Sequence, residues 1–121
     1  MEQKINDLHD IINNSGGADY YCRFSSIPGF PVITNNVRSL AEVAGCYWLL
    51  DIIGSYQYSK KLDVSFQVWV LEVDLENSTA VVRGYNDTKL IITQDIPFTD
   101  FPLEKLELYL MDGVILLPSE Y

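Results

Sequence analysis

The stretch GCYWLLDII, residues 45–53, decides the fold predicted for this 121-residue chain. At about 100° per residue, its apolar side chains cover nearly every side of a helix, and Asp51 is the one charged residue in it. A helix that is apolar all round is buried against other elements on several faces. The stretch therefore predicts a long apolar helix inside a folded core.

The same helix is expected to begin ahead of this stretch. Asn35 or Asn36 can cap its first turn, and the spacing of the apolar residues continues it to about residue 56 or 58. Its apolar stripe consists of Val37, Leu40, Ala41, Ala44, Tyr47 and Trp48.

Two further segments precede this helix. Residues 3–14 predict a short amphipathic helix with Ile5, Leu8 and Ile12 on one side. Residues 18–36 contain two prolines and predict an ordered loop with at most a short extended piece.

After Lys60-Lys61 the apolar period changes from 3.6 to 2, and β-branched and aromatic residues become frequent, which predicts sheet. The first strand is apolar on both faces in its middle, as in a central strand that is covered on two sides. Asn86-Asp87 and Asp112-Gly113 predict tight hairpin turns. The strands are expected at about residues 64–74, 79–85, 89–96, 106–111 and 114–117.

These elements predict one α+β domain over residues 1–121. Two N-terminal helices precede a mostly antiparallel, five-stranded meander sheet, and the long apolar helix packs on one sheet face.

The charge of the chain lies mainly in its second half. The net charge is −9, and residues 62–121 hold eleven acidic and three basic residues, which gives −8. Such a field repels nucleic acid and anionic membranes and favours basic partners. We therefore expect a basic protein surface as partner, with no direct contact to nucleic acid or membrane.

The N-terminus is polar and periodic where a secretory signal would be continuously apolar, so a cytoplasmic location is expected. No run reaches the ~18 apolar residues of a membrane span. Cys22 and Cys46 lack a metal-like spacing and are expected to be reduced. The oligomeric state is left open between monomer and homodimer.

Asp51 is a candidate site residue because it falls on the side of the helix that should face the sheet. A buried carboxylate must be paired, hydrogen-bonded or protonated. One interpretation is a ligand or acid/base pocket that contains Asp51, Tyr47, Trp48, Gln67 and Trp69. The other, which we favour, is a structural carboxylate bonded to a group of a neighbouring strand.

A set of acidic residues is the second candidate. Glu72 and Asp74 share one face of the first strand, so they and their neighbours are candidates for a site that takes a basic protein surface. The ordinary role of such charges is to keep a sheet face soluble and its edges protected. The set consists of Glu72, Asp74, Glu76, Asp95 and Glu107.

No catalytic, metal or cofactor motif accompanies these residues. His9 is the only histidine and lies beside the stripe of the first helix with no partner at metal-like spacing. Cys46 inside an apolar helix is expected to be an inert thiol. We therefore predict no cofactor, no metal site and no catalytic residue.

The order of four sequence pieces resembles a family of small uncharacterised bacterial proteins, a domain of unknown function associated with plasmids, phages and other mobile elements. The resemblance covers about residue 18 to the end, with TNNV at residues 34–37 where the family has a Thr-Asp-Gly-Val-like turn. The family has no known activity, so no functional residue is transferred. The pieces are GCYWLLDII (45–53, with YWLLD), FQVW (66–69), TDFPL (99–103) and LPSEY (117–121).

Two functions from different classes follow. The first is a non-enzymatic, acidic interaction protein of a phage or mobile element, in its most specific form an inhibitor of a host nuclease or defence complex, like an anti-CRISPR protein. The second is a small-ligand-binding or enzymatic pocket protein organised on Asp51. We expect the first, and a pocket that reaches Asp51 would favour the second.

Overall fold

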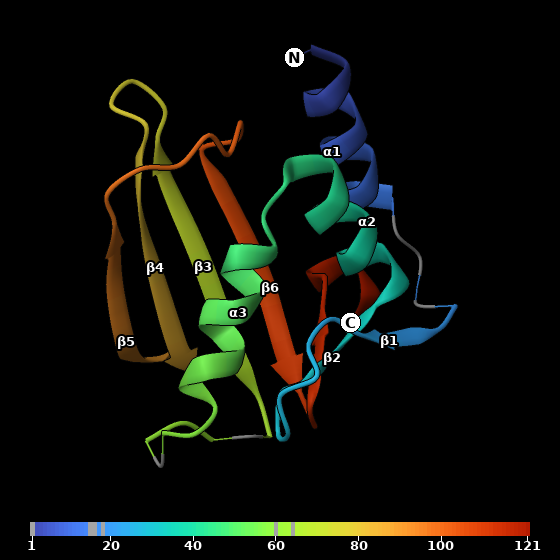
Figure 1. Ribbon diagram of the computed structural model, residues 1–121, viewed down its shortest axis with the longest axis vertical. Coiled ribbons are helices and arrows are strands. Elements are labelled where there is room, and N and C mark those ends of the chain that lie inside the picture. The colour runs from blue at the N-terminus through green and yellow to red at the C-terminus, as the bar shows by residue number, and fades with distance from the viewer. Residues whose placement is uncertain (1, 15–16, 18, 60, 64) are drawn as a thin grey trace.

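The computed structural model describes residues 2–14, 17, 19–59, 61–63 and 65–121 (Figure 1). They form an α+β fold with helices and one mixed sheet. The elements are α1 (Glu2–Asn14), β1 (Tyr21–Arg23), β2 (Val32–Thr34), α2 (Asn35–Ala44), α3 (Tyr47–Tyr56), β3 (Gln67–Asp74), β4 (Thr79–Asn86), β5 (Lys89–Ile96), β6 (Lys105–Met111), β7 (Val114–Leu116) and the 3-10 helix η1 (Pro118–Glu120).

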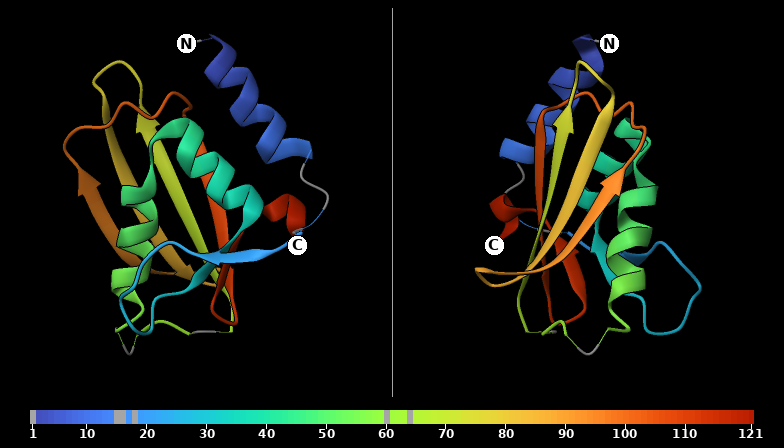
Figure 2. Two further views of the ribbon diagram at one scale, coloured as in Figure 1. Left: turned by 45° about the vertical axis from the view of Figure 1, so that its right-hand side comes forward. Right: turned by 90° about the vertical axis from the view of Figure 1, so that its left-hand side faces the viewer.

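The strands form one sheet in the order β1-β2-β7-β6-β3-β4-β5. All neighbours are antiparallel except β2 and β7, which are parallel. Helices α2 and α3 lie on one face of this sheet, as the edge-on view in Figure 2 shows. The α1 helix lies beside α2 and η1, at the end of the molecule where β6 begins (Figures 1 and 2).

The core lies between the sheet and the α2–α3 layer. On β3 the residues that face the helices are Gln67, Trp69 and Leu71, while Val68, Val70 and Glu72 face the opposite side. The helices contribute Val37, Leu40, Ala41, Ala44, Leu49, Leu50 and Ile53, and the sheet contributes Ile33, Trp69, Leu71, Val82, Leu106, Leu108, Leu110 and Ile115, all at most 2% exposed.

The expected long helix is two helices, so this part of the prediction was wrong. Gly45 has φ +65°, in the left-handed region that ends helices, and its N–H bonds to the carbonyl of Ala41. The chain starts a new helix after Cys46, which caps α3 without a side-chain bond. The break resets the helical phase, so the stripe of α2 does not continue into α3.

The five-stranded meander was also wrong in its connections. The predicted hairpin of residues 79–85 and 89–96 is confirmed as β4 and β5, with the turn one residue later at Asp87-Thr88. After β5, however, residues 97–104 cross the ends of β4 and β3, and β6 pairs with the far side of β3 (Figure 1).

This crossing segment carries the TDFPL piece, and its side chains close one end of the core. Phe101 and Leu103 are 2% and 8% exposed. The N–H of Thr99 donates to the carbonyl of Ser78 at 2.8 Å, which ties the segment to the β3–β4 turn. TDFPL is therefore a structural piece of the chain.

The region predicted as a loop contains two strands of the sheet, although residue 18 lies outside the described residues. β2 lies between β1 and β7, and its residue Ile33 is fully buried opposite Ile115. The hairpin at Asp112-Gly113, with φ angles of 50° and 80°, is confirmed, and it places β7 beside β2.

In the described part of the chain, helices cover the central strand β3 on one side only, although Val70 on its other side is only 8% exposed. β3 begins at Gln67, and residue 64 of the predicted start lies outside the described residues. On β4, Gly84 is paired with Trp69 of β3 and leaves room for the indole ring. A Cβ atom at position 84 would lie 2.7 Å from this ring, which is too close. Val68 and Val70 point to the other face, where the described residues provide no covering helix over β3, β4 and β5 (Figure 2).

Candidate interaction surface

The open face is the side of β6, β3, β4 and β5 that is turned away from α2 and α3. Strand register orders its side chains in rows that run across the strands. One row consists of Lys105, Glu72, Val81 and Asp95, the next of Glu107, Val70, Arg83 and Thr93, and the third of Tyr109, Val68, Tyr85 and Leu90.

Three members of the predicted acidic set lie on this face, in two rows that also hold the basic residues Lys105 and Arg83. Glu72 and Asp95 occupy the same row on β3 and β5, and Glu107 lies one row away on β6. Glu72 and Asp95 are exposed, and Glu107 is half-buried. An ion pair of 2.6 Å joins Glu72 to Arg83, so this carboxylate is partly neutralised.

The other two acidic residues lie at the β3–β4 turn. Asp74 accepts hydrogen bonds from the backbone N–H of Asn77 at 3.2 Å and from its side-chain amide at 2.8 Å. These bonds hold the pKa of Asp74 below its usual value. Glu76 is an exposed turn residue next to it. The main role of Asp74 is therefore to stabilise the β3–β4 turn. Glu76 adds a second acidic side chain at this turn.

Aromatic rings cover one end of the open face. Phe66 and Tyr109 have ring centroids 5.2 Å apart, and the ring of Tyr121 packs on both at 5.9 and 5.7 Å. Burial, followed by the nearby Glu107 carboxylate, raises the pKa of Tyr109. Tyr121 is 74% exposed, so the cluster presents a ring to solvent.

Asp51 does not lie where the sequence placed it. It is exposed on α3, whose buried side carries Leu49, Leu50, Ile53 and Gly54. The prediction assumed that the phase of α2 continues through Gly45, and the break removes that relation. Both interpretations of Asp51, the structural carboxylate and the pocket, started from a buried carboxylate. Because Asp51 is exposed, it needs no buried partner and neither interpretation is supported.

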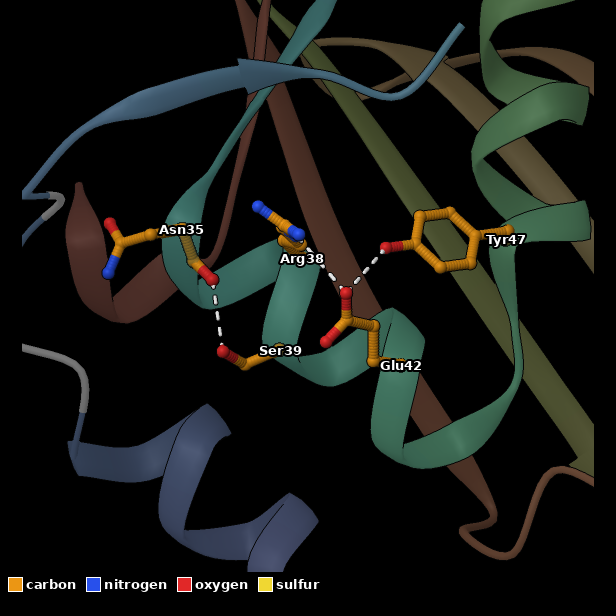
Figure 3. A network of polar contacts seen from close by, with 5 residues as sticks. All are labelled: Asn35, Arg38, Ser39, Glu42 and Tyr47. Carbon is orange, nitrogen blue, oxygen red and sulfur yellow. Dashed lines mark hydrogen bonds and ion pairs between the residues drawn. The ribbon is translucent and has the colours of Figure 1, made fainter.

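Tyr47 belongs to a surface network that links α2 to α3 (Figure 3). Its hydroxyl donates to Oε1 of Glu42 at 3.3 Å, and the guanidinium Nε of Arg38 donates to the same oxygen at 3.1 Å. In the same turn of α2 the Ser39 hydroxyl donates to the carbonyl of Asn35 at 3.1 Å (Figure 3). Burial, followed by Glu42, raises the pKa of Tyr47.

Gln67 and Trp69 form a buried polar cluster with Gln57. The Gln67 amide donates to Gln57 Oε1 at 2.8 Å and to the Asp63 carbonyl at 3.1 Å. Its oxygen accepts from Gln57 Nε2 and from the indole N–H of Trp69, each at 2.9 Å. All four bonding positions of the Gln67 amide are used within the protein, which is the pattern of a structural group. Trp48, the remaining predicted pocket residue, is half-buried on α3.

Other candidate groups are weaker. Burial raises the pKa of the Cys46 thiol to about 12, so it is protonated at neutral pH. Among the described residues, no group of three or more His, Cys, Asp or Glu side chains could hold a metal ion. His9 borders a surface groove of about 580 Å³ beside α1, which is otherwise lined by Ile12, Asn13, Leu75, Pro102, Leu103, Glu104 and Lys105.

Glu120 in LPSEY is a polar centre that the sequence did not predict. Its Oε1 accepts from the Thr34 hydroxyl and from the Leu117 N–H, both at 2.9 Å, and its Oε2 accepts from the Asn36 amide at 3.1 Å. The Thr34 hydroxyl in turn caps α2 by accepting from the Val37 N–H at 3.1 Å. The carboxylate thus joins the C-terminus to the start of α2 and explains TNNV and LPSEY structurally.

None of the helices in the described part of the chain is long and apolar enough to cross a membrane. No curated protein and no solved structure matches the chain. Residues 6–121 match the model of a family described as a family of unknown function (DUF6876). The match begins within α1 and covers α2, α3 and the described strands up to Tyr121. The chain therefore belongs to this family of unknown function.

Proposed function

We propose that this protein is a non-enzymatic interaction protein that binds a basic surface of a partner through the acidic part of its open face. The observation that carries the proposal is the sheet register. It brings Glu72, Asp95 and Glu107 from three strands onto the side of the sheet that α2 and α3 leave uncovered, with Glu107 at its β6 edge, in a groove that α1 and η1 also line. Carboxylates gathered in this way complement a basic protein surface.

The distribution of charge supports the same proposal. Residues 62–121, which include all four strands of the open face, hold −8 of the net charge of −9. A field of one sign accelerates encounter with an oppositely charged partner. Glu72 is paired with Arg83, so Asp95 and Glu107 are the better candidates for pairing with a partner's cations.

The more specific form of the proposal joins the family resemblance, which implies a bacterial protein of a phage or mobile element, to the small, acidic and motif-free character of the chain. It describes a cytoplasmic protein that inhibits a host nuclease or defence complex. Such enzymes hold nucleic acid with Lys and Arg, so an acidic sheet face can compete for the same cations. Monomer and homodimer are both compatible with this role.

The pocket function organised on Asp51 has less support. Asp51 is exposed, Tyr47 is bonded to Glu42, and the polar atoms of Gln67 are used within the core. These side chains do not converge on one site, so the open face is the better basis for a function.

Charge reversal on the open face tests the proposal. We expect Asp95→Lys/Glu107→Lys to weaken binding of a partner captured from the native host, and then purified, by about ten- to thirtyfold at low salt. The loss should shrink as salt rises, since exposed charges are screened beyond the ~8–10 Å Debye length. Titration calorimetry across a salt series measures both effects.

Asp10→Lys/Asp51→Lys is the matched control. It makes the same change in net charge, from −9 to −5, at two exposed positions on α1 and α3. We expect the control to keep most of the affinity. Equal weakening by both pairs would show that only the overall charge matters, and salt-independent binding of the Asp95→Lys/Glu107→Lys protein at wild-type affinity would exclude the acidic surface.

A further inference from the structure

The third row of the open face is apolar and crosses four strands. Tyr109 of β6, Val68 of β3, Tyr85 of β4 and Leu90 of β5 are paired side by side in the register. The first three are half-buried, and Leu90 is 47% exposed. An apolar stripe on one face of a sheet is normally covered by another element, as α2 and α3 cover the opposite face.

The apolar row is bordered by charged residues along one side and by aromatic rings at one end. Towards the β3–β4 turn, the two rows that follow hold Glu107, Glu72 and Asp95 together with the basic residues Lys105 and Arg83. At the β6 end the row meets the ring cluster of Phe66, Tyr109 and Tyr121. The face therefore presents an apolar stripe with a charged border along one side, in which Arg83 is paired with Glu72 and three carboxylates outnumber two cations, and with aromatic rings at one end.

The edge of the sheet is less suited to a partner than this face. β5 carries an extra residue, Ile91, where the register shifts between Gly84 and Tyr85 of β4. A bulge and a lysine, here Lys89, are features that protect edge strands from pairing with another chain. A partner that uses the apolar row must lie on the face instead of extending the sheet.

We propose that the open face binds an amphipathic basic helix of another protein. The apolar side of this helix lies along the row of Tyr109, Val68, Tyr85 and Leu90, and its Lys and Arg side chains reach Glu107 and Asp95. The inference rests on the proposed function and specifies the partner. Four strands span three spacings of about 4.8 Å, or roughly 14 Å, which a helix of about ten residues at 1.5 Å per residue covers.

A designed peptide tests this inference. The probe is a helix of about 14 residues made only of leucine and lysine, with Leu at i, i+3, i+4 and i+7. A second peptide of the same composition has the order scrambled, so that its leucines no longer share one side. Fluorescence anisotropy of the labelled peptides against the full chain gives each Kd. We expect the amphipathic peptide to bind at least tenfold more tightly than the scrambled one.

Threonine substitutions on the apolar row locate the site, because Thr keeps strand propensity while it removes apolar surface. We expect Leu90→Thr to weaken binding of the amphipathic peptide about threefold and Val68→Thr/Leu90→Thr about tenfold. Ile27→Thr is the matched control, since Ile27 is also 47% exposed but lies in the loop between β1 and β2. The control should keep wild-type affinity, and circular dichroism should show the same fold for all variants.

The outcomes separate this inference from the proposed function. Equal affinity for both peptides, together with weakening of both by Asp95→Lys/Glu107→Lys, would overturn the amphipathic helix and leave the acidic surface standing. Equal weakening by Ile27→Thr and Leu90→Thr would also overturn the assignment to this row. Binding of neither peptide at low salt would contradict both proposals.

Discussion

A chain that ends at Gly113 is expected not to fold. The deletion removes β7, which pairs with β6 on one side and with β2 on the other, so β1 and β2 lose their connection to the sheet. It also removes Ile115 and Leu117, which are fully buried. Loss of each such side chain costs about 2–5 kcal/mol, against a total stability of about 5–15 kcal/mol. Far-ultraviolet circular dichroism and thermal melting measure the result.

A smaller change in the same region provides the control. Glu120→Ala keeps β7 but removes the carboxylate that accepts from Thr34, Asn36 and Leu117. We expect a folded protein that is less stable by about 1–3 kcal/mol, because the cap of α2 loses its support. A truncated chain with an unchanged melting temperature would contradict the assignment of residues 114–117 to the core of the sheet.

Gln67→Leu is expected to destabilise the protein by about 2–4 kcal/mol, although it makes the core more apolar. The leucine leaves the buried indole N–H of Trp69 without its acceptor and removes both bonds between the Gln57 and Gln67 amides, although Gln57 Nε2 keeps its bond to the Ile53 carbonyl. A change of this size lowers the melting temperature of a domain of this length by roughly 8–20 °C. Urea unfolding of the variant measures the free energy directly.

Two further variants test whether the lost hydrogen bonds of Gln67 cause the destabilisation. Gln94→Leu removes a similar amide from the same sheet face, where it accepts only the Tyr56 hydroxyl bond at 2.7 Å, and should cost less than about 1 kcal/mol. Trp69→Phe removes the indole N–H that Gln67→Leu would leave unpaired. The double variant should therefore lose less stability than the sum of the losses of the two single variants. Wild-type stability of Gln67→Leu would show that the amide pair contributes nothing.

The strands with local signals could be predicted from the sequence. Alternating apolar residues and short turns define β4 and β5, and Asp112-Gly113 with its left-handed φ angles defines the β6–β7 hairpin. The first helix is confirmed at residues 2–14 for the same reason, because its stripe is local. Packing of a helical layer on one sheet face is also confirmed.

The features that were missed depend on distant residues or on one backbone angle. The left-handed φ of Gly45 divides the expected helix, and Asp51 turns outward as a result. Pairing of β6 with β3, and of β2 with β7, joins strands that are far apart in the chain, and no turn signal reports such pairs.

In the candidate site, too, the features with a local sequence signal could be predicted, and those that depend on pairing between strands could not. That Glu72 and Asp74 share a strand face could be predicted from the period of two. That Asp95 and Glu107 join Glu72, and that Tyr109, Val68 and Tyr85 form one row beside them, depends on the register between strands. The acidic candidates were therefore found from sequence, while the apolar row next to them was not.

The most direct measurement of the central claim is a map of where a basic amphipathic helix binds. Methyl and amide resonances of the uniformly labelled protein, followed by NMR during titration with the leucine–lysine peptide, report each face of the sheet separately. The open-face account predicts shifts concentrated at Val68, Val70 and Val81. The resonances of Val37 of α2 and Ile53 of α3, which are buried in the core on the other side of the sheet, should stay unchanged. Shifts confined to α2 and α3, with Val68 and Val70 unaffected by saturating peptide, would contradict the account.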